Sequence, residues 1–198
     1  MMFRRIAIVS TALLLTACAN IEHKTPEARQ QIKHDLKIVE IVDTSMTSFC
    51  WLLIDGVAQC KYTPGISVLT PDSLVLVNYE KGTYVQKDVI KTEDVKCISD
   101  ADGQNFYVFK DKLAVSLIPY TEVHRAPLEN NPEYRAKVIK MLLSNGQPYL
   151  TGKDATITRG TGRKEYGVHN VYAPSGPVPI VVGSEVIQIF SPCPANSK

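Results

Sequence analysis

Short apolar segments separated by turn signals dominate the first two thirds of this chain of 198 residues. The segments are rich in β-branched and aromatic residues, and glycine- or proline-containing turns separate most of them, as in strands joined by tight turns. The expected strands are 36–42, 73–79, 83–90, 95–98, 105–110 and 113–118, with a further pair at 166–173 and 179–190. This pattern predicts an antiparallel sheet in a small sandwich or barrel.

One segment has helical signals instead. Asn131 is a suitable N-cap, Pro132 fits the first helical position, and Asn145-Gly146 is a typical stop. An apolar stripe runs along the segment at Tyr134, Val138, Met141 and Leu142. The sequence therefore predicts an α+β fold that is mostly β, with one main helix at about 131–145.

The N-terminus has the regions of an export signal. Arg4 and Arg5 precede an uncharged, mostly apolar run over residues 6–15. At about 1.5 Å per residue, this run is too short to cross a hydrocarbon core of about 30 Å. The run ends in Leu15-Thr16-Ala17-Cys18, which resembles the lipobox of bacterial lipoproteins. The resemblance implies that residues 1–17 are a cleaved signal peptide and that Cys18 carries acyl chains such as palmitate. An ordinary signal peptide with a coincidental cysteine is the alternative.

Lipidation would tether the mature protein to a membrane without a spanning segment. Ala19 is not the aspartate that resembles an inner-membrane retention signal in enteric lipoproteins. We therefore expect an outer-membrane location, lipid-anchored at the periplasmic face, with surface display as an alternative. Residues 18–35 are polar and are expected to form a tether, with a helix from Glu27 as an option. Residues 36–198 are expected to form a single β-rich domain.

The charge balance excludes one class of partner. The chain has 22 Lys+Arg and 20 Asp+Glu, and residues 1–17 hold two of the basic residues and no acidic ones, so the mature chain has 22 − 2 = 20 of each sign. A neutral chain without a long basic run argues against nucleic acid. The expected partners are the membrane, through the lipid anchor, and other envelope proteins.

Four cysteines remain besides Cys18: Cys50, Cys60, Cys97 and Cys193. An even number in an oxidising periplasm favours disulfides, and no Cys-x-x-Cys pair suggests a zinc or redox site. We favour Cys50–Cys60 with Cys97–Cys193. A three-residue loop at 54–56 with Gly56 in the left-handed region would place Cys50 opposite Cys60 in a hairpin, whereas a two-residue loop would place the sulfurs on opposite faces. The other two pairings stay open.

No catalytic set is recognisable in the sequence. A Gly-x-Ser-x-Gly elbow is absent, and the histidine spacing matches no two-ligand metal motif. The histidines are His23, His34, His124 and His169. The acidic turn at 100–105 departs from EF-hand spacing, because its glycine is fourth instead of sixth. We expect no enzyme, metal site or cofactor. An envelope hydrolase with an unrecognised site, built on His124 or His169 with a carboxylate, is the third hypothesis.

The most suggestive polar run is TRGTGRKEYG, residues 158–167. Arg159, Arg163 and Lys164 among three glycines could bind a phosphate or carboxylate group, and a solvated loop is the alternative. Our leading hypothesis is a non-enzymatic envelope lipoprotein, an accessory or scaffold subunit of an outer-membrane or cell-envelope assembly. The second is a periplasmic binding module that holds an anionic or glycan ligand at this loop.

Overall fold

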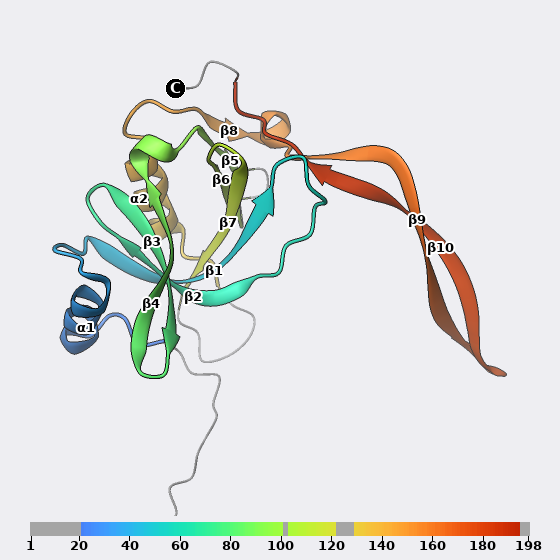
Figure 1. Cartoon of the computed structure of the whole chain (residues 1–198), viewed down its shortest axis with the longest axis horizontal. Helices are drawn as coiled ribbons and strands as arrows, with labels where there is room; N and C mark the ends of the chain where they lie inside the picture. Colours follow the sequence, from blue (N-terminus) through green and yellow to red (C-terminus); the bar gives the residue numbers. More distant parts are fainter. Residues whose placement is uncertain (1–20, 101–102, 122–128, 195–198) are drawn as a thin grey trace, which may run out of the picture.

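The computed structural model describes residues 21–100, 103–121 and 129–194, and these residues are mostly β (Figure 1). The helices are α1 (Pro26–Leu36) and α2 (Pro132–Leu142). The strands are β1 (Asp43–Leu53), β2 (Thr63–Leu69), β3 (Ser73–Glu80), β4 (Thr83–Lys91), β5 (Cys97–Asp100), β6 (Phe106–Phe109), β7 (Leu113–Tyr120), β8 (Tyr149–Thr151), β9 (Thr158–Ala173) and β10 (Gly176–Ile189). The prediction of a mostly β, α+β fold is confirmed.

Eight strands form one sheet in the order β4-β3-β2-β1-β7-β6-β5-β8. All neighbours are antiparallel except β5 and β8. The long strand β1 pairs with β2 through residues 43–49 and with β7 through residues 46–53, so it belongs to both halves of the sheet. One core cluster draws buried side chains from both halves and from α2. The two halves therefore share a core, which α2 helps to cover.

Strand β3 explains how this sheet is buried on both faces. Leu74 and Leu76 lie in the cluster with α2, whereas Val75 and Val77 lie in a second cluster that contains Ile32 of α1. Successive side chains of a strand point to opposite faces, so each helix covers one face. The nearly continuous apolar run of this strand follows from that double burial.

Local turn and capping signals predicted two elements well. The β3–β4 hairpin turns at Lys81 and Gly82, both with positive φ (52° and 86°), as a tight hairpin turn requires. Helix α2 begins as expected, because the Asn131 side chain accepts a hydrogen bond from the Tyr134 backbone N–H at 3.1 Å. Three of the four stripe residues of α2 are fully buried: Tyr134, Val138 and Leu142.

The expectation of a polar tether over residues 18–35 needs correction. The part of it that the structure describes contains α1, and Ile32 of this helix is completely buried. The helix is fixed to the β3–β4 hairpin, because Asp35 accepts a hydrogen bond from the Tyr84 N–H at 3.0 Å and Gln31 donates one to the Gly82 carbonyl at 2.7 Å. The folded unit therefore begins before residue 36, and sparse apolar residues were enough to dock an otherwise polar helix.

The strand expected at 36–42 is also wrong. Helix α1 continues to Leu36 and ends at Lys37, whose φ of 56° is left-handed. Residues 38–42 then lead into β1 without forming a strand, and the Arg29 side chain donates to the Ile41 carbonyl at 2.8 Å. The aliphatic run serves the docking of α1, and β1 begins only at Asp43.

Candidate functional site: a projecting hairpin arm

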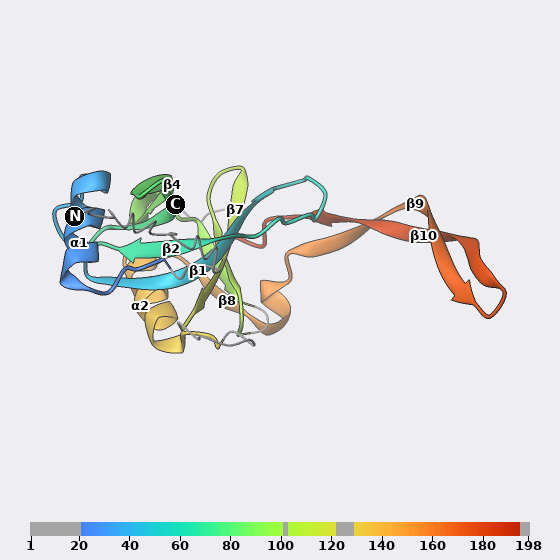
Figure 2. The same cartoon turned by 90° about the horizontal axis from the view of Figure 1, so that it is seen from below.

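Strands β9 and β10 form a two-stranded sheet of their own, outside the eight-stranded sheet. Figures 1 and 2 show this hairpin projecting from the end of the molecule opposite α1. We call residues 158–189 the arm. Ala173 pairs with Gly176 across a two-residue turn, and the register continues back to Thr158 and Ile189 with one irregularity between Glu185 and Ile187.

The arm is exposed and largely apolar. Residues 158–172 are all solvent-exposed, and Ile189 is the only arm residue that is fully buried. Residues 166–184 contain no Asp, Glu, Lys or Arg. Monomeric proteins rarely leave a contiguous apolar surface of this kind to water, and such surfaces mark sites of interaction.

Both faces of the arm carry apolar side chains. Residues that pair across antiparallel strands share a face, and successive residues alternate. One face therefore holds Tyr166, Val168, Tyr172 and Val181, which are 72%, 70%, 85% and 69% exposed. The opposite face holds Val171, Val178, Ile180 and Val182, each 38–48% exposed. Ordinary one-sided docking of a sheet would leave one of these faces in water.

The base of the arm is held by the loop between β1 and β2. The Asp55 N–H donates to the Ile189 carbonyl at 2.8 Å, and the Ile189 N–H donates to Gly56 at 2.9 Å. The Ala58 N–H donates to the Ile187 carbonyl at 2.8 Å. The base is thus attached to the domain by strand-like pairing, and the rest of the arm has only its own two strands.

Two disulfides flank this base, and they are the predicted pairs. Cys50–Cys60 closes the β1–β2 loop, with Cα atoms 5.8 Å apart. Cys97–Cys193 joins β5 to the segment that follows the arm, with Cα atoms 5.5 Å apart. Cys60, Cys97 and Cys193 also belong to an apolar cluster that includes Ile189 of the arm. Both bridges therefore help to fix the arm on the domain.

The hairpin geometry that supported the first pairing is wrong. The positive φ lies at Asp55 (64°) and not at Gly56, and Cys50 lies opposite Ser116 of β7. Cys60 is in the irregular segment before β2. Because residues 55–58 pair with the arm, the two strands begin to pair with each other only at Phe49 and Thr63.

The expected anion-binding loop is part of β9 and is not a loop. The Gly162 N–H, a backbone donor that an anion would need, donates to the Glu185 carboxylate at 2.7 Å. Arg163 forms an ion pair with Glu165 at 2.5 Å, and Lys164 lies opposite Glu185. The Arg159 guanidinium lies over the ring of Phe190, 5.6 Å from its centroid. Carboxylates of the same chain therefore accompany two of the three cations.

The three histidines that the structure describes do not converge with a recognisable catalytic partner. His169 lies on the arm opposite Ile180, His34 is exposed on α1, and His124 lies outside the described residues. His23 contacts Thr44, Nδ1 to Oγ1, at 2.8 Å, but both residues are buried. The Thr44 hydroxyl donates to the His23 carbonyl at 3.1 Å, so the ring Nδ1–H donates to Thr44 and is not a base for that hydroxyl.

The acidic turn uses its carboxylate inside the fold. Asp100 accepts hydrogen bonds from the Gly103 N–H at 3.0 Å, from Arg135 of α2 and from the Tyr149 hydroxyl of β8. Its role is to join the turn, α2 and β8. Among the residues the structure describes, no group of three or more His, Cys, Asp or Glu side chains is arranged to hold a metal ion.

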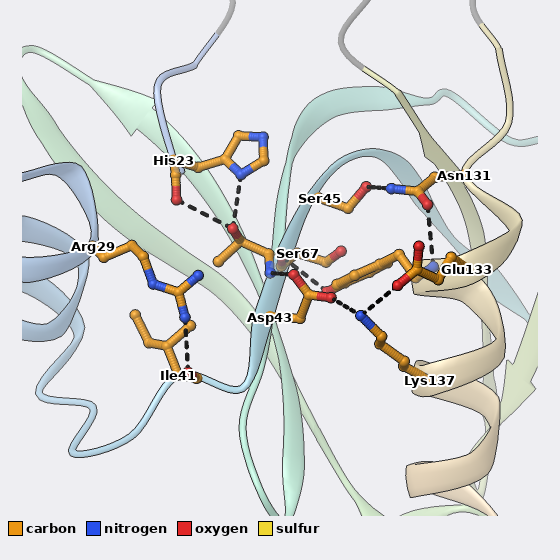
Figure 3. A network of polar contacts seen from close by, with 11 residues as sticks. His23, Arg29, Ile41, Asp43, Ser45, Ser67, Asn131, Glu133 and Lys137 are labelled. Atoms are coloured by element: carbon orange, nitrogen blue, oxygen red, sulfur yellow. Dashed lines mark hydrogen bonds and ion pairs between the residues drawn. The ribbon is translucent and has the colours of Figure 1, made fainter. Parts of the chain in front are cut away.

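A polar network joins His23, which precedes α1, to β1 and α2 (Figure 3), and a separate contact joins Arg29 of α1 to the Ile41 carbonyl. Lys137 of α2 contacts Asp43 at 2.8 Å and Glu133 at 2.9 Å, and these hydrogen bonds raise the pKa of Lys137 to about 12. The Tyr134 hydroxyl donates to the Ser67 carbonyl at 2.9 Å, and burial raises the pKa of Tyr134. The contacts position helices on the sheet, which is a structural role.

A hollow of about 520 Å³ lies beside α1, at the end opposite the arm. Its lining includes Glu22, Glu27, Tyr79 and Tyr84. The Glu22 carboxylate accepts hydrogen bonds from the backbone N–H groups of residues 23–25, and these bonds lower its pKa. A lining with two glutamates does not favour the anionic ligand that the sequence suggested.

No helix in the described part of the chain is long and apolar enough to cross a membrane. No protein-family model matches the chain, and no curated protein matches it. It is similar to solved structures of Vav1 inhibited by an allosteric inhibitor (TM-score 0.40, 12% identity, covering 74% of this chain and 36% of that one) and of human RhoA with the DH/PH fragment of PDZRHOGEF (0.39, 14%, 61% and 32%). It is also similar to the DH/PH domains of p115-RhoGEF, with a TM-score of 0.39 and 12% identity, over 61% of this chain and 34% of that one. The chain spans about a third of the length of these structures, and likeness at this level carries no conclusion about function.

Sequence reasoning found both strands of the arm but missed that they stand alone. The available signal was the long stretch without charge, residues 166–184, with apolar residues at both odd and even positions. That pattern alone also fits a strand buried on both faces.

Proposed function

We propose that this protein is a non-enzymatic envelope lipoprotein, and that it serves as an accessory or scaffold subunit by docking its arm on a partner protein. The arm carries the proposal, because it exposes apolar side chains on two faces and its distal half has no formal charge. Each Val or Ile side chain that a partner fully buries would contribute about 1.5–3 kcal/mol before the costs of association. Burial of a few such side chains would be enough for a specific contact.

The placement of the arm suits a protein held at a membrane. Cys18 precedes Ile21, the first described residue, by three residues, and three residues of chain extend at most about 11 Å. Ile21 packs in the cluster that contains Ile32 of α1, and α1 lies at the end opposite the arm. A strand of 14 residues, such as β10, extends about 45 Å. A lipid on Cys18 would thus anchor the protein near the end of the domain opposite the arm.

The two disulfides support an oxidising compartment, since structural disulfides are rare in reducing ones. They also suit a docking element, because a fixed base reduces the conformational entropy lost on binding. An enzyme would need a substrate-accessible nucleophile and base, and the His23–Thr44 contact is buried.

The test is crosslinking in cells of the tagged, full-length protein, followed by mass spectrometry of the proteins that are recovered with it. Val181→Asp places a charge on the arm, where the side chain is 69% exposed. Val39→Asp is the matched control, because Val39 is 92% exposed and lies in the segment after α1. We expect V181D to reduce recovery of the partner at least ten-fold and V39D to leave it unchanged.

Recovery of the wild-type protein without a stoichiometric partner would contradict the proposal, and so would equal recovery with V181D. Arg163→Glu distinguishes docking on a protein from the alternative, the binding of an anionic ligand. Loss of a glycan or anionic ligand on R163E, with no protein partner in the wild type, would replace docking with ligand binding as the function.

A further inference from the structure

The two long edges of the arm differ in their capacity to pair with another strand. Proline has no backbone N–H, so a proline in a paired strand must sit where its nitrogen faces outward. Pro177 and Pro179 are both paired residues of β10, opposite Tyr172 and Asn170. The outer edge of β10 therefore lacks two donors near the tip of the arm.

The same alternation identifies the outward groups of β9. In an antiparallel pair, residues alternate between pairs bonded to each other and pairs whose N–H and C=O groups face outward. The residues opposite Pro177 and Pro179 are of the second kind, and the regular register carries the alternation to Val168 opposite Val181 and Tyr166 opposite Gly183. The outer edge of β9 thus presents the backbone donors and acceptors of residues 166, 168, 170 and 172.

Native proteins protect an exposed strand edge with charged side chains, prolines or bulges. The edge of β10 has two prolines near the tip, whereas the register irregularity lies nearer the base, where residues 161–163 of β9 face Val186 alone. Residues 166–173 of β9 have no Lys, Arg, Asp, Glu or Pro, and their register is regular. In the described part of the chain, no third strand belongs to this sheet. One edge of the arm is protected and the other is open.

We infer that the open edge of β9 is the docking site, and that it takes an extended, uncharged β-strand of a partner protein as a third strand of the arm. This inference rests on the proposed function and specifies its contact. An extended polypeptide matches the edge because it supplies the complementary N–H and C=O groups, and apolar side chains at alternate positions would extend both apolar faces. Affinity would come from the backbone and from burial on the two faces.

A second copy of this chain fits the edge less well. Antiparallel pairing of two β9 strands about a two-fold axis would point the arms in opposite directions. The α1 ends, which lie opposite the arms (Figure 2), would then be at the two far ends of the pair. Two chains anchored near Ile21 in one membrane surface could adopt that arrangement only with both arms lying parallel to that surface. A strand from a different protein has no such restriction.

Val168 and Val181 provide a matched test. They are cross-strand neighbours on the same face, 70% and 69% exposed, and both have outward-facing backbone nitrogens. Val168→Pro removes a donor from the β9 edge, and Val181→Pro removes one from the β10 edge. Neither change removes a hydrogen bond between β9 and β10. The side chain lost is identical, so only the edge differs.

The assay is the in-cell crosslinking described above, on the full-length protein. We expect V168P to reduce partner recovery at least ten-fold, while V181P retains at least half. Equal loss with both variants would overturn strand addition, because it would indicate recognition by side chains alone. Full recovery with V168P would also overturn it. If the wild-type protein shows no partner, the proposed function itself fails, which is a distinct result.

Amide hydrogen exchange on the complex isolated from cells tests the same inference without a substitution that could disturb the arm. Peptides covering residues 166–172 should exchange at least ten-fold more slowly in the complex than in the free protein, while those covering 178–183 change by less than two-fold. Protection of the β10 peptides alone, or of neither strand, would overturn the assignment. A homodimer of the purified protein that V168P dissociates and V181P does not would show a second copy on this edge and would also overturn it.

Discussion

The two disulfides should differ strongly in their contribution to stability, although they lie in the same region of the molecule. Cys97–Cys193 spans 96 residues and Cys50–Cys60 spans 10. In the loop-entropy description, a bridge stabilises the folded state by restricting the unfolded chain, and the effect increases with the logarithm of the loop. The two separations correspond to about 4.7 and about 2.7 kcal/mol at 25 °C.

The comparison is well matched, because each bridge joins one fully buried cysteine to one that is partly buried. Replacing each pair with alanines should therefore remove similar packing from both sites, and the difference of about 2 kcal/mol should remain. Urea unfolding of the mature protein, followed by far-UV circular dichroism and by fluorescence of Trp51, would measure it. We expect C97A/C193A to lower the free energy of unfolding more than C50A/C60A. An equal or reversed order would refute the reasoning, since it would mean that native packing or structure in the unfolded chain outweighs loop closure.

Three further predictions concern the core and α1. Ile32→Ala should cost about 2–5 kcal/mol of unfolding free energy in urea, because Ile32 is fully buried, and a cost near zero would restore the tether interpretation. Tyr134→Phe should cost about 1–2 kcal/mol in the same assay, because it leaves the Ser67 carbonyl without its hydroxyl donor, and an unchanged stability would contradict the role of that bond. The hydrogen bond from the Tyr84 N–H, followed by His34, lowers the pKa of Asp35. Its stabilising contribution is therefore complete above the unfolded pKa and is lost as the pH falls through the folded pKa. Asp35→Asn should make the free energy of unfolding less dependent on pH between about 5 and 3. A variant whose free energy of unfolding falls with pH as steeply as that of the wild type would contradict this prediction.

The sequence predicted those elements that short-range chemistry determines. The β3–β4 hairpin follows from a turn at Lys81-Gly82 that adopts positive φ. Helix α2 follows from Asn131, Pro132 and one apolar stripe. Segment 36–42 has residues typical of a strand, yet it forms none. It contacts α1 instead, where Arg29 donates to the Ile41 carbonyl. Tertiary contacts of that kind leave no local trace.

The arm shows the limit most clearly. Strand β3 and strand β10 both have apolar residues at successive positions, such as 74–77 and 180–182. In β3 the helices and neighbouring strands bury both faces, whereas in β10 the same pattern stays in water. The residues of a strand cannot distinguish burial on both faces from exposure on both faces, because they show which side chains are apolar and not which other elements cover them. The cysteine pairing was predicted correctly, but from a hairpin geometry that the chain does not adopt.

The two ends of the arm are neighbours. Thr158 pairs with Ile189, and just outside them the Phe190 N–H donates to the Ile157 carbonyl at 2.9 Å. The chain therefore leaves the domain and returns to it at one point, like an insertion between adjacent residues. Excision of 158–189 with a direct junction of Ile157 to Phe190 would remove no strand of the eight-stranded sheet, although it would remove the buried Ile189 side chain. The proposed docking element and the eight-stranded sheet are in this way separate stretches of the chain, so the arm can be changed at many positions without altering a residue of the sheet that carries it.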